Sequence, residues 1–260
     1  AKTNQPVLLT GETGVGEELL ARAIHKLSHR TGLFVPVNVA GLDDTLFSDT
    51  LFGHKKGAFT GADAERQGLV EKASKGTLFL DEIGDLSISS QSKLLRLIQE
   101  CEYLPLGSDI LRRSDARIIV ATNQSLQELM NQGRFRKDLY YRLHTHYVHL
   151  PPLRERLDDL PLLVDHFLEE AATALGKKKP TPPPELIQLL GTYHFPGNVR
   201  ELRSMIFDAM SKHRSGKFSL EVFKKRIFKS TDYRLTELRD KPCLLYTSPS
   251  PRDLSTSRMP

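Results

Sequence analysis

The sequence predicts an α/β fold: a three-layer domain with a parallel sheet, followed by a small all-α lid domain. Over roughly the first 150 residues, short apolar strands alternate with amphipathic helices, and a strand, helix, strand succession implies a parallel crossover. A glycine-rich turn joins the first strand to the first helix, as in domains that bind phosphate groups. After Pro151 and Pro152 the strands stop and only helical periodicity remains.

We place the sheet domain at residues 1–152, the helical domain at 153–230 and a tail, expected to be disordered, at 231–260. Residues 243–260 resemble translated vector or sequencing-adapter sequence, because they are rich in serine and proline and lack periodicity. The chain begins a few residues before its first predicted strand, so we expect a fragment of a longer protein.

The composition is that of a globular chain, with 39% hydrophobic and 27% charged residues. No stretch approaches the length of a membrane span, and the N-terminus lacks the organisation of a signal peptide, so we expect a cytoplasmic protein without membrane contact. The formal net charge is +5, but no basic face or readable motif predicts DNA binding. Cys101 and Cys243 show no metal or disulfide spacing.

The first predicted strand, Val7–Thr10, leads into a turn with the features of a phosphate cradle. Glycines permit a tight backbone there, and a helix is predicted over about residues 17–29. Backbone N–H groups and the helix N-terminus would then point at the β- and γ-phosphates of a nucleotide. The cradle comprises Gly11, Glu12, Thr13, Gly14, Val15, Gly16, Glu17 and Glu18.

Position 17 departs from the usual cradle pattern, G-x-x-x-x-G-K-[ST], because Glu17 stands where the pattern has lysine. At an effective dielectric constant of about 20, unit charges about 4 Å apart interact by roughly 4 kcal/mol, so the reversal changes the interaction with phosphate by about twice that. Three interpretations stay open: a sequencing or cloning error, a genuine inactivation, and a turn that does not bind nucleotide.

A short strand ending near Asn38 and a short helix over residues 41–52 are predicted next. The glycine-rich stretch 53–62 follows, and Phe59 is its one large apolar residue after Phe52. We expect either a surface loop with an exposed aromatic tip, which suits partner binding, or a phenylalanine folded back onto the core. Composition leaves both alternatives open.

An apolar strand over residues 77–80 ends in Asp81 and Glu82. Ligand sites of parallel sheets lie at the carboxyl ends of the strands, so these acids would face a cradle on a neighbouring strand. Asp81 would hold Mg²⁺, directly or through water, and Glu82 would orient and deprotonate the attacking water. The alternative, that the acids only open the next turn, is disfavoured by the cradle.

A helix over residues 89–102 and a buried strand ending in Asn123 follow. Asn123 either fixes the water or the γ-phosphate, or simply begins a turn. Arg136 and Arg142 are six residues apart, so on one helix they lie on different faces. Such arginines either stabilise transition-state charge in a neighbouring subunit or lie solvated on the surface.

His144, His146 and His149 flank a predicted strand, and the first two share a face. No carboxylate or cysteine completes a metal-binding set around them, so we expect no metal there.

The last part of the chain is helical over about residues 158–174, 183–192, 198–213 and 219–229. Asn198 and Glu201 form a predicted capping box, with Asn198 as the N-cap residue. This arrangement leaves Arg200 free to reach bound phosphates from the start of a lid helix.

Together, residues 5–229 resemble the AAA+ central domain of bacterial enhancer-binding proteins, the NtrC-like activators of sigma-54 RNA polymerase. The specific signature is Gly57, Ala58, Phe59, Thr60, Gly61 and Ala62, which reproduces the GAFTGA loop of that family letter for letter. The resemblance implies that this loop contacts sigma-54, with Phe59 and Thr60 at its tip. In the family the cradle reads GESGTGKE or close to it, so Glu17 is the residue that does not fit.

The resemblance also implies roles for the other site residues, with ATP and Mg²⁺ as cofactors. Asp81 and Glu82 match the Walker B pair, Asn38 the residue that restrains the catalytic glutamate, Asn123 the first sensor motif, Arg136 and Arg142 the paired arginine fingers, and Arg200 the second-sensor arginine.

The implied mechanism is ATP hydrolysis between subunits of a ring, expected to be a hexamer, which moves the GAFTGA loops and remodels the closed promoter complex. Promoter DNA would be reached only indirectly, because no helix-turn-helix is recognised in the chain. Two alternatives remain. Glu17 would make the chain a hydrolysis-deficient subunit that still binds partners or joins rings. An unrelated AAA+ remodeller is disfavoured by the GAFTGA loop.

Overall fold

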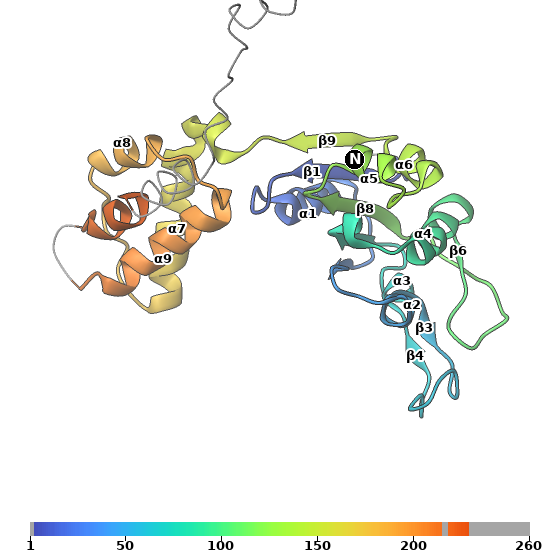
Figure 1. The fold of residues 1–260 in the computed structure, drawn as a ribbon. Helices are drawn as coiled ribbons and strands as arrows, with labels where there is room; N and C mark the ends of the chain where they lie inside the picture. The colour runs from blue at the N-terminus through green and yellow to red at the C-terminus, as the bar shows by residue number, and fades with distance from the viewer. Residues whose placement is uncertain (1–2, 215–217, 229–260) are drawn as a thin grey trace, which may run out of the picture.

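A computed structural model describes residues 3–214 and 218–228 of the chain. It contains a sheet domain and a helical domain, which are joined at the end of β9 (Figure 1). The predicted tail at 231–260 lies outside the described residues. Among the helices in the described ranges, none is long and apolar enough to cross a membrane.

The sheet domain is built on five parallel strands in the order β2-β5-β8-β1-β9. These strands are β1 (Val7–Gly11), β2 (Phe34–Asn38), β5 (Thr77–Asp81), β8 (Arg117–Thr122) and β9 (Tyr147–Leu150). The expectation that the cradle strand neighbours the strand ending in the two acids is wrong, because β8 lies between β1 and β5. Strand order follows from tertiary packing, which the local pattern does not encode.

Alternate residues of the central strands face opposite layers, as the two-residue period of a strand requires. On one face, Leu8, Leu80 and Val120 pack with the helices α2, α4, α5 and α6 in the larger core. On the other face, Leu9 and Ile119 pack against α1. The sheet therefore lies between two helical layers, which is the three-layer arrangement that the sequence predicts.

Three helices of the sheet domain, α1, α2 and α4, agree with the predicted ones to within a few residues, and the three others were not predicted. In chain order, the helices are α1 (Glu17–Leu27), α2 (Asp44–Phe52), α3 (Leu69–Lys72), α4 (Ile88–Glu100), α5 (Leu126–Asn131) and α6 (Lys137–Leu143). Asp43 and Ser87 cap α2 and α4 by accepting backbone N–H groups of the first turn.

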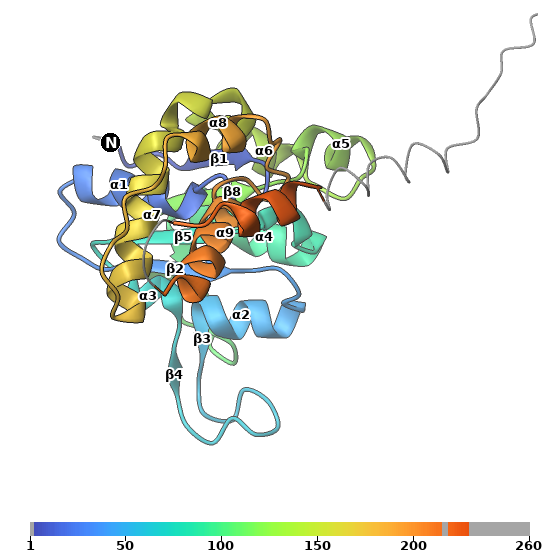
Figure 2. The same cartoon turned by 90° about the vertical axis from the view of Figure 1, so that its left-hand side faces the viewer.

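Two small hairpins project from the sheet domain and were not predicted (Figures 1 and 2). One pairs β3 (Gly53–His54) with β4 (Arg66–Gln67), and the other pairs β6 (Glu102–Tyr103) with β7 (Arg112–Arg113). Each strand has only two residues, which is too short to show a hydrophobic period in the sequence.

The helical domain has its own core, which begins at Leu153 and includes Phe167, Phe195 and Met205. Its helices are α7 (Leu160–Leu175), α8 (Glu185–Gly191) and α9 (Asn198–Lys212), followed by a helical segment over residues 221–228. The Lys177 ammonium donates to three carbonyls near the end of α9, at 2.7 to 2.9 Å, and so satisfies the carbonyls that a helix end leaves unpaired.

Candidate nucleotide site and partner-binding loop

The turn between β1 and α1 has the geometry of the predicted phosphate cradle. Gly14 and Gly16 have φ angles of 83° and 110°, in the left-handed region that glycine adopts without strain. No side chain caps the N-terminus of α1, so its first-turn N–H groups are not taken by a capping oxygen. The turn therefore offers backbone donors and the positive end of a helix dipole to an anion.

A cavity of about 390 Å³ opens beside the cradle, at the ends of β1, β8 and β9. In its wall, the His144 ring stacks on Tyr147 with centroids 4.8 Å apart, and His149 Nδ1 lies 3.3 Å from Thr10 Oγ1. Neither these histidines nor His146 belong to a metal-binding cluster, since no such group of His, Cys, Asp and Glu exists within residues 3–214 and 218–228.

Asp81 and Glu82 stand at the carboxyl end of β5. Burial raises the pKa of the Asp81 carboxyl, and burial together with the Asp81 charge raises the pKa of Glu82. Glu82 has a φ of 61°, and its Oε2 is buried with no hydrogen-bond partner among the residues described. A desolvated carboxylate in a strained position is suited to the role of general base.

Glu17 lies against this pair of acids. Burial, followed by the charges of Asp81 and Glu82, raises the pKa of Glu17 to about 7. The Oε1 atom of Glu17 is buried and accepts no hydrogen bond from any described residue. The three carboxylates repel one another, whereas a lysine at position 17 would be attracted to the other two. Position 17 is thus the electrostatic defect of the cradle.

Arg200 approaches the three carboxylates from the helical domain. It lies in the first turn of α9, and its charge lowers the pKa of Glu17, Asp81 and Glu82 against the effect of burial. The backbone N–H of Arg200 donates to the Gly14 carbonyl at 3.3 Å. The structure therefore places the charge of Arg200 near the three carboxylates beside the cradle.

The two predicted asparagines differ in what they contact. Asn123 follows β8, and its Nδ2 donates to Thr13 Oγ1 at 2.8 Å, so it stands between the cradle and the acids of β5. The Asn38 side chain instead accepts the backbone N–H of Ala40 at 2.8 Å. The expected contact of Asn38 with Glu82 is not formed in this structure, because Asn38 turns back onto its own loop.

Arg136 and Arg142 lie at the two ends of α6 rather than both within it. Arg136 precedes the helix and pairs with Asp138 at 2.6 Å, and its Nη1 donates to Ser92 at 3.0 Å. Arg142 lies in the last turn, where its Nε is buried without a hydrogen-bond partner among the described residues. Among the described residues, no hydrogen bond or ion pair joins either arginine to Asp81 or Glu82.

Sequence reasoning missed the residues that join the two domains at the cradle. Arg154 forms a two-pronged ion pair with Glu12, with N···O distances of 2.8 and 2.5 Å. The prediction of Asn198 as an N-cap residue is wrong: Gly197 occupies that position, and the Asn198 amide contacts Glu12 and Leu153 instead. An arginine two residues after a pair of prolines gives no sign in the sequence of a contact 142 residues away.

The donors present fit a nucleotide phosphate and a divalent cation, with one exception. Backbone N–H groups of the cradle and the Arg200 guanidinium suit phosphate oxygens. Burial disfavours the ionised form of Asp81 and so raises its pKa. When ionised, Asp81 would supply the carboxylate oxygen that Mg²⁺ prefers. Glu17 is the exception, because it places a carboxylate where the phosphates would lie.

The GAFTGA loop lies at the tip of the β3–β4 projection (Figures 1 and 2). The Gly57 N–H donates to the Ala62 carbonyl at 2.8 Å, and the Ala62 N–H donates to Phe59 at 3.0 Å, which closes a compact turn. Phe59 is 41% exposed, and its ring packs edge-on against His54 with centroids 5.0 Å apart. Phe59 therefore stays at the surface and does not fold back into the core.

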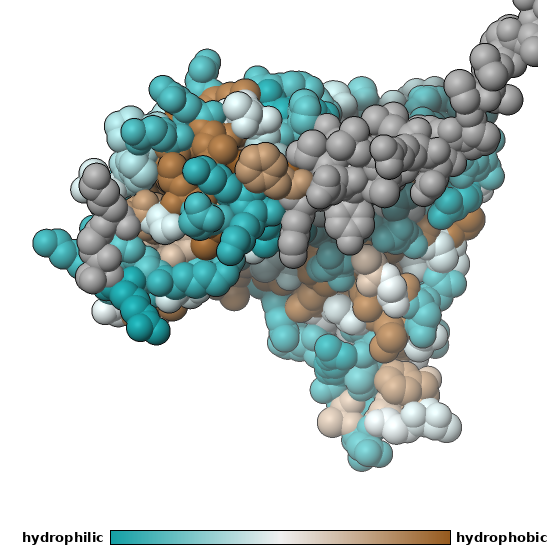
Figure 3. All heavy atoms as spheres, turned by 60° about the vertical axis from the view of Figure 1, so that its left-hand side comes forward, coloured by the Kyte–Doolittle hydropathy of each residue, from teal (hydrophilic) through white to brown (hydrophobic). Residues whose placement is uncertain are grey.

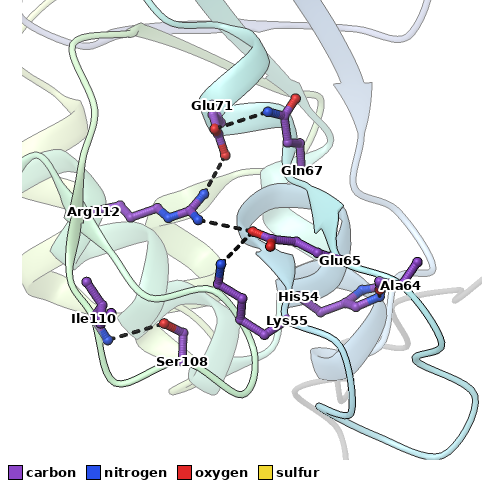
Figure 4. Close-up of polar contacts among 9 residues, drawn as sticks. All are labelled: His54, Lys55, Ala64, Glu65, Gln67, Glu71, Ser108, Ile110 and Arg112. Carbon is purple, nitrogen blue, oxygen red and sulfur yellow. Dashed lines mark hydrogen bonds and ion pairs between the residues drawn. The ribbon is translucent and has the colours of Figure 1, made fainter.

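A network of charged side chains holds the base of this projection (Figure 4). Lys55 pairs with Glu65 at 2.7 Å, and Arg112, which comes from β7, pairs with Glu65 at 3.2 Å and with Glu71 at 2.7 Å. The backbone N–H of Lys55 also donates to the Leu106 carbonyl at 3.0 Å. The two hairpins are therefore linked to each other at their bases and where Gly107 lies against Ala58, while Phe59 and Thr60 at the loop tip stay exposed.

Hydrophobic and polar side chains mix on the surface of this projection (Figure 3). Ile110 and Leu111 of the second hairpin are 72% and 46% exposed, and Thr60 beside Phe59 is exposed as well. Exposed apolar side chains on a projecting element are typical of a surface that binds another protein.

The fold and this site define a phosphate-loop nucleotide-binding domain with a helical lid. Family models match both parts: the "Sigma-54 interaction domain" over residues 1–149 and the "AAA+ ATPase lid domain" over residues 154–238. The chain belongs to the sigma-54 interaction domain family.

Relatives and solved structures agree with this assignment. The chain is 45% identical over 223 residues to the formate hydrogenlyase transcriptional activator of Salmonella typhimurium, covering 85% of the chain and 32% of that protein. It is 46% identical over 206 residues to the transcriptional regulator NtrC of Rhizobium meliloti, covering 79% of the chain and 42% of that protein. NtrX of Brucella abortus in complex with ATP superposes with a TM-score of 0.79 at 30% identity, over 97% of this chain and 53% of that one. The chain thus spans less than half the length of these two curated relatives.

Proposed function

We propose that this chain is the ATP-driven part of a bacterial activator that remodels the closed complex of sigma-54 RNA polymerase. One observation carries the proposal: a phosphate cradle and an exposed GAFTGA loop belong to the same sheet domain. The chain from residue 39 to residue 76, which carries α2, the β3–β4 hairpin and α3, connects β2 to β5, the strand that ends in the two acids. A movement at the carboxyl ends of β2 and β5 would therefore reach the GAFTGA loop through this connection.

In this proposal Glu82 accepts a proton from the attacking water. Asn123, which donates to Thr13, would lie between the cradle and the two acids and keep them in place relative to each other. Asp81 would hold Mg²⁺, which neutralises phosphate charge when it is bound. Arg136 and Arg142 would act on the nucleotide of a neighbouring subunit in a ring, expected to be a hexamer. The chain would work in the cytoplasm and reach promoter DNA only through the polymerase.

A second candidate function rests on Glu17. Because three carboxylates crowd the cradle, the chain as written is disfavoured for binding a triphosphate. It would then be a hydrolysis-deficient subunit that joins rings or contacts sigma-54.

ATP hydrolysis by the parent chain and by Glu17→Lys, each measured against protein concentration, separates the two, because activity of Glu17→Lys alone would make the parent the hydrolysis-deficient subunit. We expect Glu17→Lys to hydrolyse ATP with a specific activity that rises with concentration, since site groups come from two subunits. Glu17→Lys combined with Glu82→Gln is the blank. If Glu17→Lys is folded and hydrolyses no more ATP than this blank at any concentration, the catalytic proposal fails and the binding subunit is favoured.

A further inference from the structure

The helical domain grips the phosphate loop at four consecutive residues. Glu12 accepts from Arg154 and Asn198, the Thr13 carbonyl accepts from Asn198 at 3.2 Å, and the Gly14 carbonyl accepts from the Arg200 backbone. The Val15 carbonyl completes the series by accepting from an Arg156 Nη2 at 2.7 Å. In Figure 1 the β1–α1 loop accordingly extends towards the helical domain.

Asn198 is the buried centre of this grip. Its side-chain carbonyl accepts the Leu153 N–H at 2.8 Å, while its amide nitrogen donates to Glu12 and to Thr13. Asn198 is 0% exposed and has a φ of 48°, a left-handed conformation that asparagine tolerates better than most residues. One side chain therefore ties the first core residue of the lid, the start of α9 and the cradle together.

Of the four cradle residues that the lid contacts, only Glu12 carries a charge. It faces the lid rather than the carboxylates of β5: its two oxygens are taken by Arg154 and Asn198. These partners lower the pKa of Glu12 to about 2, so the carboxylate stays ionised across the physiological range.

We propose that Glu12, Arg154 and Asn198 are positioning residues that dock the lid on the phosphate loop before any nucleotide binds. Docking fixes the start of α9 against Gly14 and so holds Arg200 beside the cradle. The approach is close, because a Cβ added at Gly14 would lie 2.7 Å from the Gly197 carbonyl oxygen. A change in the backbone of the loop is thereby passed directly to the lid. Its bearing on hydrolysis rests on the proposed function, but docking itself does not.

The test measures the distance between the domains in the nucleotide-free full chain by pulsed electron paramagnetic resonance. Spin labels go on Leu27→Cys in α1 and Leu162→Cys in α7, which are 64% and 73% exposed. Cys101 and Cys243 are first replaced by serine. The parent is expected to show one narrow distance, whereas Glu12→Gln and Arg154→Glu should lengthen and broaden it.

Two controls distinguish positioning from a general loss of structure. Glu170→Gln breaks an ion pair of the same two-pronged kind, Arg203 with Glu170 at 2.6 Å, which lies wholly within the lid, and it should leave the distance unchanged. The exchange Glu12→Arg with Arg154→Glu should return most of the narrow distance. The return is incomplete because Asn198 cannot donate to an arginine at position 12.

The proposal is overturned if Glu12→Gln and Arg154→Glu keep the parental distance, or if both open the molecule and the exchange recovers none of it. Both outcomes are independent of ATP hydrolysis. A chain that docks normally but never hydrolyses ATP would contradict the proposed function and leave the docking role intact.

Discussion

The phosphate cradle and the GAFTGA loop are both glycine-rich turns of one sheet domain, yet they are held in opposite ways. The cradle is enclosed between β1, α1 and the lid, and each residue from Glu12 to Val15 contacts the lid. The GAFTGA loop is held at Ala58, which lies against Gly107, and at Phe59, which packs on His54, but no described atom approaches within 4 Å of a Cβ built on Gly57 or Gly61. The cradle is thus the closely held turn and the GAFTGA loop the largely free one, which suits ligand binding and partner contact respectively.

The largest effect is expected at position 17, where the cradle departs from its pattern. Glu17→Lys removes one of three crowded carboxylates and supplies a cation. We expect ATP to bind on the order of 1,000-fold more tightly, because solvent leaves about half of the roughly 8 kcal/mol charge reversal. Titration calorimetry with ATP measures this. Glu100→Lys is the matched control, since it makes the same charge change on an exposed side chain of α4 that pairs with Arg96, outside the cradle. Equal gains in the two variants would contradict the account.

The contrast between the two turns is tested by the same substitution in each. Gly14→Ala combines a positive φ with a backbone clash at 2.7 Å, and should cost roughly 3 kcal/mol of unfolding free energy. Gly57→Ala has a φ of 82° but open space, so only the conformational cost of about 1 kcal/mol applies. Denaturant unfolding compares them. If the two costs are equal, the enclosed and free descriptions are wrong.

A smaller effect is expected from Glu12→Gln, and its pH dependence has a definite sign. The folded-state pKa of Glu12 is about 2, below the ordinary value of 4.5, so the stabilisation is complete above 4.5 and is lost as the pH falls towards 2. The ion pair of Glu12 with Arg154 is partly exposed, so solvent screening reduces its contribution to the unfolding free energy to roughly 1 kcal/mol.

Chemical unfolding of parent and Glu12→Gln between about pH 7 and pH 3 measures this difference. The gap in unfolding free energy should shrink as the pH falls. A gap that grows at acid pH would reverse the assigned sign.

The smallest effect on stability is expected at the free loop. Phe59→Ala should change the unfolding free energy by less than about 0.5 kcal/mol, because the ring is 41% exposed and packs only on the surface. Thermal unfolding measures this. A loss of several degrees in Tm would show that the loop is part of the core after all.

Much of the fold follows from local patterns. The apolar runs that lead to Asn38, Asp81 and Asn123 are parallel strands, of which the last two are buried, and the alternation of Leu8 and Leu9 between two layers is the two-residue period that such strands require. The cradle is also visible locally, since its glycines and the helix that follows are contiguous in sequence. These features depend on neighbours in the chain, which is why the sequence reveals them.

The remaining features depend on distant residues. The position of β8 between β1 and β5, the contact of Arg154 with Glu12 and the role of Asn198 are set by tertiary packing. Asn198 shows the difficulty most clearly. An asparagine three residues before a glutamate is a good capping box, but a buried interdomain contact here outweighs the cap, and Glu201 keeps only its half by accepting the Gly197 N–H at 2.9 Å.

The most direct test of the central claim, that nucleotide at the cradle controls the free loop, is the binding of sigma-54 to Glu17→Lys with and without an ATP transition-state analogue. We predict that the analogue strengthens sigma-54 binding and that Phe59→Ala abolishes this gain while still binding the analogue. If sigma-54 binds equally in both states, or if Phe59→Ala keeps the full gain, the cradle and the GAFTGA loop are not coupled in the way proposed.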